Sequence, residues 1–219
     1  MTTMSNSRVL ITDLQYFASV NWYINVYNYK DVIIHLYESH SKMSFRNRLW
    51  LAGADGRLSL SIPVSDSRNE KQLYRDLKIV SGRWPTEHLR AIISCYNRSP
   101  YFEYYRDELA DLYSRPFLFL IDWNFACFEW MEKCLGKKVG LTMVDLHNKG
   151  EMQERFNGAE MVDERNHIRP SALARLSGNQ DGVIRYRQVF EDRVGFIPDL
   201  SILDLLFCTG PAANEKLAG

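Results

Sequence analysis

The chain of 219 residues carries 27 basic and 27 acidic side chains, so its formal net charge at neutral pH is zero. This balance removes the general electrostatic reason to expect binding to nucleic acid or to an anionic membrane surface. The length suits one sizeable core, and we expect a single domain over residues 1–219. Aromatic residues make up 13% of the chain and 12 of them are Tyr, which favours a cleft lined by side chains with one polar end.

The cysteines stand at positions 95, 127, 134 and 208, without metal-ligand spacing or the density of a secreted disulfide scaffold. No His-Glu-x-x-His helix, clustered Cys/His set or glycine-rich phosphate loop occurs, so we expect no metal site and assign no cofactor. A signal-peptide pattern and a run of about 18 apolar residues are also missing. We therefore expect a cytoplasmic protein without a membrane span.

Alternation of apolar and polar residues predicts a mixed α/β fold, in which helices pack on one mixed β-sheet. The strands of that sheet are expected at 8–11, 31–37, 48–52, 57–64, 73–80 and 183–190. The turn Gly53-Ala-Asp-Gly56 predicts a hairpin between the third and fourth of these strands. A helix is expected over Tyr16 to Tyr29.

Further helices are predicted by periodicity and by their end signals. Pro85 suits the first turn of one helix, and Ser99 is expected to cap the next. A longer helix is expected from Arg115-Pro116 to the C-cap Gly136, and a final one from Pro198 to Gly210. A short strand is expected at 139–144. The polar stretch 146–181 is expected to be a partly mobile excursion or a lid, with one short helix near 171–176.

His88 is the first candidate for chemistry, because it shares one helix face with Ile92, Cys95 and Tyr96. An imidazole titrates near neutral pH and can act as a general acid or base, with Tyr96 as the group that orients it. A half-buried structural histidine is the commoner role on such an apolar face. The spacing leaves both roles open.

A second candidate is the basic group formed by Lys42, Arg46, Asn47 and Arg48. Two guanidiniums beside an amide suit a carboxylate, phosphate or pyrophosphate group, since each fork pairs with two oxygens. Strand alternation would put Arg46 and Arg48 on the same face. We expect Arg46, Asn47, Arg48 and His88 to come together around one cleft. An exposed, salt-bridged strand start is the alternative.

Several blocks of these residues resemble the WbqC-like protein family. Lys42 to Arg48 is similar to its Lys-x-[Ser/Thr]-[Tyr/Trp/Phe]-x-Asn-Arg block, and Ile62-Pro63-Val64 ends a similar strand. Trp84 to Tyr104 looks like its Trp-x-x-x-His to Ser-Pro-[Tyr/Phe]-Phe-x-x-Tyr segment, and the stretch from Gly195 to Pro211 resembles its C-terminal signature. Ser99 and Tyr104 belong to these blocks, and the resemblance adds them to the expected substrate-binding residues.

Members of the family are associated with bacterial surface polysaccharide loci, especially those for O-antigen. The resemblance implies a role in such a pathway, with acyl or aminoacyl transfer to an amino sugar as the candidate reaction and a small molecule or sugar nucleotide as substrate. The alternative is a noncatalytic protein that binds a sugar nucleotide, a carrier protein or a biosynthetic partner. The sequence leaves open whether the protein is an enzyme and which oligomeric state it has.

The chain departs from the family pattern at two places. Asp13 to Ala18 lacks the proline common there, and Leu36-Tyr37 replaces a stretch that is often acidic in relatives. If those family residues are catalytic, this chain has lost or relocated them.

Overall fold

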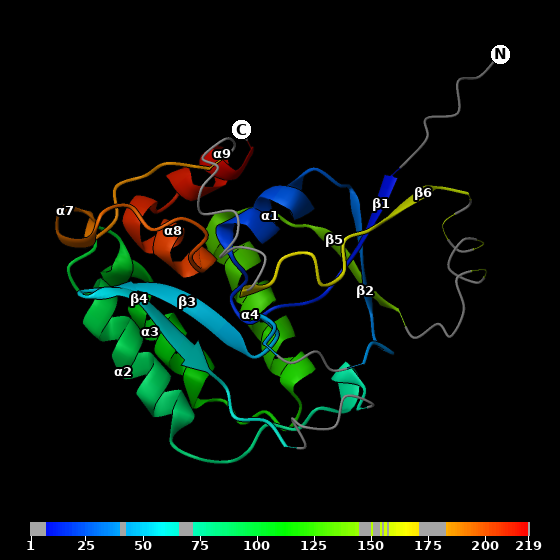
Figure 1. Cartoon of the computed structure of the whole chain (residues 1–219), viewed down its shortest axis with the longest axis horizontal. Helices are drawn as coiled ribbons and strands as arrows, with labels where there is room; N and C mark the ends of the chain where they lie inside the picture. Colours follow the sequence, from blue (N-terminus) through cyan, green and yellow to red (C-terminus); the bar gives the residue numbers. More distant parts are fainter. Residues whose placement is uncertain are drawn as a thin grey trace.

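The computed structural model describes residues 8–39, 43–65, 72–144, 158–170 and 183–218, together with residues 150, 154 and 156. These residues form a parallel sheet, a separate hairpin and helices that surround both, which confirms the expected mixed α/β fold class. Figure 1 shows the parallel sheet at one end of the molecule, with the hairpin and helices α2 and α3 at the other.

Four parallel strands form the larger sheet, in the order β5-β2-β1-β6. They are β1 (Arg8–Thr12), β2 (Asp31–His35), β5 (Gly140–Val144) and β6 (Glu160–Asp163). β1 and β2 are runs of Val, Leu and Ile that are buried on both faces, as the inner strands of a parallel sheet must be. Helix α1 (Val20–Tyr27) connects them, and the Ser19 hydroxyl caps it by accepting a hydrogen bond from the Trp22 backbone N–H.

The expected hairpin is confirmed as β3 (Arg48–Gly53) and β4 (Gly56–Ser61), which pair antiparallel. Gly56 turns the chain with a φ of +115°, a conformation that side chains with a Cβ rarely adopt. The expectation that this hairpin joins the other strands in one sheet is wrong, because it forms a sheet of its own.

Two of the predicted strands are also wrong. The first, 73–80, contains the short 3₁₀ helix η1 (Tyr74–Asp76) and makes only isolated bridges, such as Val64 with Ile79. The second, 183–190, has no strand. In both segments the apolar residues of the alternating pattern pack into the core, as the buried Leu77 and Tyr186 do. The pattern therefore reflects burial of side chains and not the pairing of strands.

Helices α2 (Trp84–Tyr96), α3 (Phe102–Ser114), α4 (Leu120–Leu135) and α8 (Ile202–Thr209) lie where helices were predicted but differ at their ends. Helices α7 (Glu191–Val194) and α9 (Ala212–Ala218) were not predicted. Pro85 lies in the first turn of α2, and Gly136 caps α4 with a left-handed φ of +66°. Ser99 does not cap α3: Tyr101 holds that position, and the Ser99 hydroxyl donates instead to the Tyr96 carbonyl at the end of α2.

One large apolar cluster joins most of these elements. It contains Leu10 and Val32 of the parallel sheet, Leu49 and Leu51 of the hairpin, and the inner faces of α1, α2, α3, α4 and α8. A smaller cluster around Ile33 covers the other face of the parallel sheet. The hairpin and the parallel sheet therefore share a core although they share no backbone ladder.

The polar stretch 146–181 contains a strand that its composition does not indicate. β6 pairs with β1 from Arg8–Glu160 to Ile11–Asp163 and completes the parallel sheet. Residues 145–149 and 171–182, including the short helix expected near 171–176, lie outside the described residues, so the expectation of a lid stays a prediction. Within the part of the chain that the structure describes, no helix is long and apolar enough to cross a bilayer.

Candidate functional site

The carboxyl ends of β1, β2 and β6 meet at one edge of the parallel sheet. Asp13 follows β1, Glu38 lies shortly after β2, and Arg165 lies shortly after β6. The chain builds outward from β1 to β2 and β5, and then returns to place β6 on the other side of β1. Ligands of open α/β sheets bind outside the carboxyl ends of the strands at such a reversal. This edge is therefore the expected position of a ligand site.

Arg46 is the most deeply buried charge at this edge, with a side-chain exposure of 0%. Its Nη2 donates a short hydrogen bond to Glu38 Oε2, its Nη1 donates to the Ser39 carbonyl at 2.9 Å, and its Nε lies 3.7 Å from Asp13 Oδ2. The guanidinium also lies 5.0 Å from the centre of the Tyr74 ring. A buried guanidinium requires such partners, because it has lost its hydration.

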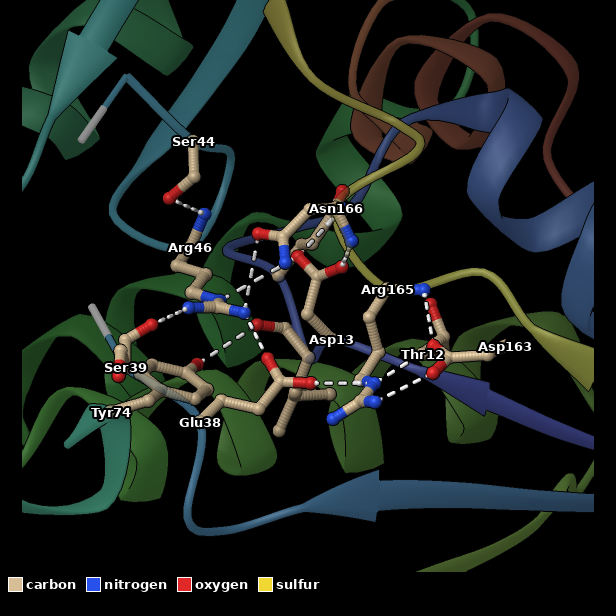
Figure 2. Close-up of polar contacts among 12 residues, drawn as sticks. Thr12, Asp13, Glu38, Ser39, Ser44, Arg46, Tyr74, Asp163, Arg165 and Asn166 are labelled. Atoms are coloured by element: carbon tan, nitrogen blue, oxygen red, sulfur yellow. Dashed lines mark hydrogen bonds and ion pairs between the residues drawn. The ribbon is translucent and has the colours of Figure 1, made fainter. Parts of the chain in front are cut away.

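Glu38 is held between two guanidiniums, as Figure 2 shows. Arg165 places its Nε 3.2 Å from Glu38 Oε1 and its Nη2 2.6 Å from Asp163 Oδ2. Burial raises the pKa of the Glu38 carboxyl above its usual value, and the charges of Arg46 and Arg165 oppose that rise. The bond to Asp163 raises the pKa of Arg165, which stays charged.

Asp13 fixes the loop that follows β6. Its Oδ1 accepts the backbone N–H of Asn166 at 3.0 Å, and its Oδ2 accepts the Gln15 side-chain amide at 3.1 Å. Asn166 has a left-handed φ of +59°, a conformation that Asn tolerates better than most residues. The backbone N–H of Glu164 donates to the Ile11 carbonyl at 2.9 Å. The loop is therefore bonded both to β1 and to the residue that follows β1.

These residues border an open cleft, which we call the strand-end cleft. Its lining is Tyr37, Glu38, Ser39, Asp163, Arg165, Asn166 and His167. Every one of these side chains carries a polar group, so the cleft suits a ligand rich in hydroxyl or amino groups. His167 adds an exposed imidazole, whose Nδ1 lies 2.8 Å from Glu164 Oε2.

The sequence of the WbqC-like protein family matches residues 16–216 of this chain. The chain belongs to the WbqC-like protein family. No curated protein and no solved structure matches it. The family match includes the whole lining of the strand-end cleft, from Tyr37 to His167, whereas Asp13 lies just before the matched residues.

The basic group of the WbqC-like block is divided by the structure. Arg46 lies in the buried network, but Asn47 donates its side-chain amide to the Ile62 carbonyl at 2.9 Å, and Arg48 donates its Nε to Ser61 Oγ at 3.1 Å. Arg46 and Arg48 do not share a face, since residues 45–47 form a turn and strand alternation begins only at Arg48. Lys42 lies outside the described residues.

His88 is buried, with an exposure of 6%, and does not line the strand-end cleft. Its Nδ1 lies 2.9 Å from the Tyr16 hydroxyl, which shares a short hydrogen bond with the Tyr113 hydroxyl. Burial lowers the pKa of His88 to about 4, and the Ser61 backbone opposes that shift. These surroundings are those of a structural imidazole; the catalytic role expected for His88 stays a prediction.

Tyr96 does not orient His88, so that expectation is wrong. Its hydroxyl donates to Asp204 Oδ1 at 2.7 Å and accepts the backbone N–H of Ala52 at 3.2 Å. Tyr186 donates to the other oxygen of Asp204 at 2.7 Å, and burial raises the pKa of this carboxyl to about 6. The spacing that brings Tyr96 and His88 to one helix face thus leads each side chain into a separate buried network.

The remaining predicted binding residues, Ser99 and Tyr104, do not line the strand-end cleft either. Ser99 bonds its own helix end, and Tyr104 is 79% exposed on α3. Sequence reasoning missed Asp13, Glu38, Arg165 and His167. Two of these carried a usable signal, because Glu38 directly follows the predicted strand 31–37 and Asp13 lies two positions after the predicted strand 8–11. Glu38 also places a carboxylate next to Leu36-Tyr37, the stretch where an acidic group is expected.

Proposed function

We propose that this WbqC-like protein acts in bacterial surface polysaccharide biosynthesis of the O-antigen type, and that it transfers an acyl or aminoacyl group to an amino sugar bound in the strand-end cleft. The observation that carries the proposal is the polar lining of the cleft at the carboxyl ends of β1, β2 and β6. Glu38 and Asp163 supply carboxylates and Arg165 supplies one guanidinium, so the lining has an excess of negative charge. Such a lining favours a ligand with an amine over a ligand with an anionic group at this position.

Membership in the family supports the pathway, and the site supports the class of ligand. We also propose that the protein works in the cytoplasm on a sugar nucleotide whose sugar enters the cleft. Its four cysteines are unpaired, three of them buried, which is typical of proteins in a reducing compartment.

The second candidate is a noncatalytic protein that binds the same sugar nucleotide for a biosynthetic partner. It is favoured by one observation: the carboxylates of Glu38 and Asp163 are already paired with Arg165. Groups paired in this way hold hydroxyl and amino groups well but are poorly placed to move a proton themselves.

Binding of matched sugars tests the proposal. Uridine diphosphate-linked amino sugars are compared by calorimetry with the same nucleotides whose sugar has a hydroxyl group in place of the amine. We expect the amino sugar to bind about tenfold more tightly, as one charge-assisted hydrogen bond provides. Asp163→Asn should remove most of this preference, whereas Asp107→Asn, on the exposed side of α3, should keep it.

Acyl transfer is then tested by adding acyl and aminoacyl thioesters and measuring the mass of the sugar nucleotide. A gain equal to the acyl group supports the enzyme. Selective binding of the amino sugar with no gain from any donor supports the noncatalytic candidate instead. Equal affinity for the amino and hydroxyl sugars, or no binding of either, would overturn the proposal.

A further inference from the structure

A histidine and a glutamate form a pair beside the strand-end cleft. His167 Nδ1 lies 2.8 Å from Glu164 Oε2, and the His167 side chain is 64% exposed while that of Glu164 is 33% exposed. Because a carboxylate only accepts hydrogen bonds, Nδ1 carries the proton in this contact. The neutral imidazole then has its lone pair on Nε2. An exposed imidazole in this tautomer can accept a proton from a ligand in the cleft that it lines.

The turn that carries the pair is held rigidly on the sheet. The Glu164 N–H donates to Ile11 of β1, and the Asn166 N–H donates to the buried carboxylate of Asp13. Between them, Arg165 is clamped by Glu38 and Asp163. The His167 N–H closes the turn by donating to the Glu164 carbonyl at 3.2 Å. Rigid support of this kind is what a proton acceptor needs, since small displacements cost much of the rate.

An ordinary surface ion pair offers a useful contrast. Glu103 and Arg106 also stand three residues apart, on the exposed side of α3, where such pairs contribute less than about 1 kcal/mol. The Glu164–His167 contact differs in two respects. Its basic partner is an imidazole, which can accept a proton on a ring nitrogen whereas a guanidinium has no acceptor, and its turn is anchored by buried charges at the edge where ligands of open α/β sheets bind. Buried charges of this kind add little to stability, so the stability of the fold does not by itself explain why they anchor this turn.

We propose that His167 is the proton acceptor of the strand-end cleft and that Glu164 is the positioning residue that holds its imidazole in the Nδ1–H tautomer. This inference rests on the proposed function, because it requires a nucleophile bound in the cleft. The amine reacts in its neutral form, after an ammonium group has released one proton to water.

The step balances without a further reactant. The sugar nitrogen attacks the carbonyl carbon of an acyl thioester, so that a C–N bond forms, and a proton of that nitrogen passes to His167 Nε2. The C–S bond then breaks, and the imidazolium gives the proton to the departing thiolate. The products are the amide and the free thiol, and His167 returns to its neutral form.

The tautomer is tested without any substrate by nitrogen-15 NMR of the imidazoles, with His167→Gln used to assign the signal. We expect the neutral ring of His167 to carry its proton on Nδ1 in the parent protein. Glu164→Gln should move much of the population to the Nε2–H form, and Glu103→Gln should change nothing. A parent ring that is protonated on Nε2, or a tautomer that Glu164→Gln does not affect, would overturn the inference whatever the protein binds.

The transfer assay tests the role. His167→Gln should lower kcat by about 10² to 10⁴ with little change in KM, the usual contribution of a general base. Glu164→Gln should lower kcat less and should also leave KM nearly unchanged, because it acts only through the orientation of the His167 imidazole. Glu103→Gln should match the parent in both.

The outcomes separate the two proposals. Full transfer by a His167→Gln variant with the parent's melting temperature would sink the inference and leave the proposed function intact. A parent protein that neither binds amino sugars nor acylates them would remove the proposed function and the catalytic role of His167 together.

Discussion

His88 shows how strongly a single side chain can be constrained without lying in a cleft. Tyr16 bonds its Nδ1, and the Trp84 ring meets its ring edge to face with 5.3 Å between the centroids. The imidazole is therefore neutral in the folded protein, with a pKa lowered by burial to about 4. The unfolded chain has the ordinary value of about 6.5. His88 consequently couples folding to pH.

The sign of this coupling gives a prediction for His88→Gln. Between pH 6.5 and 4 the unfolded chain binds more protons at this position than the folded protein does, so the free energy of unfolding decreases as the pH falls through that window. The decrease should approach about 3 kcal/mol in the parent and be missing in His88→Gln. Urea unfolding at several pH values measures it. Identical pH dependence in the two proteins would contradict the assigned pKa. Asp204, whose raised pKa acts in the opposite sense, is present in both and cancels.

Arg46 provides the second prediction at this scale. Arg46→Met removes the charge that compensates Glu38 and lies beside Asp13, and should lower the free energy of unfolding by about 3 to 5 kcal/mol. Arg48→Met is the matched control, because that side chain bonds only exposed partners, and it should stay within about 0.5 kcal/mol of the parent.

Adding Glu38→Gln to Arg46→Met should restore part of the lost stability, since the unpaired carboxylate is then gone. Denaturant titration of the single and double variants measures this coupling. Strictly additive losses would show that Arg46 does not act through Glu38.

At the scale of elements, a buried carboxylate ties together parts of the chain that share no ladder. Asp204 in α8 accepts from Tyr96 at the end of α2 and from Tyr186 in the segment 183–190. The Tyr96 hydroxyl also satisfies the Ala52 N–H of β3. Asp204 and Tyr96 thus connect α8 with α2, the hairpin and the segment 183–190.

Tyr96→Phe tests this junction. The variant leaves Ala52 N–H and one oxygen of Asp204 without a partner, so we expect a loss of about 1 to 3 kcal/mol in the free energy of unfolding. Hydrogen exchange at the Ala52 amide should become faster in the same variant. Tyr104→Phe removes an exposed hydroxyl and should change neither quantity. Unchanged exchange at Ala52 would mean that the junction does not depend on Tyr96.

For the whole molecule, the continuous core supports the proposal of a single domain, because residues of the parallel sheet, the hairpin and the helices belong to one apolar cluster. Tryptophans report on several of its parts, with Trp22 in α1, Trp50 in β3, and Trp123 in α4. Fluorescence and far-ultraviolet circular dichroism should therefore record one coincident unfolding transition. Two separate transitions, or proteolysis into two stable halves, would contradict the single domain.

Much of the local structure was predictable because its causes are local. The apolar runs of β1 and β2, Pro85 at the start of α2, Gly136 at the end of α4 and Gly56 in the hairpin each act within a few residues. The two false strands, 73–80 and 183–190, have the alternation of strands, but the first makes only isolated bridges and the second has no strand pairing. Alternation reports which side chains are buried, and pairing is a separate fact about the fold.

The sequence by itself determined the family, the fold class and most helices, since these depend on local periodicity and on motifs that can be read in order. Tertiary structure alone decided the candidate site. Asp13 and Asn166 stand 153 positions apart, and only the parallel pairing of β1 with β6 brings them within 3.0 Å. The same pairing places Arg165 against Glu38 and buries Arg46 beside them. Parallel strands have distant partners in sequence, so no local pattern shows which residues will share their carboxyl edge.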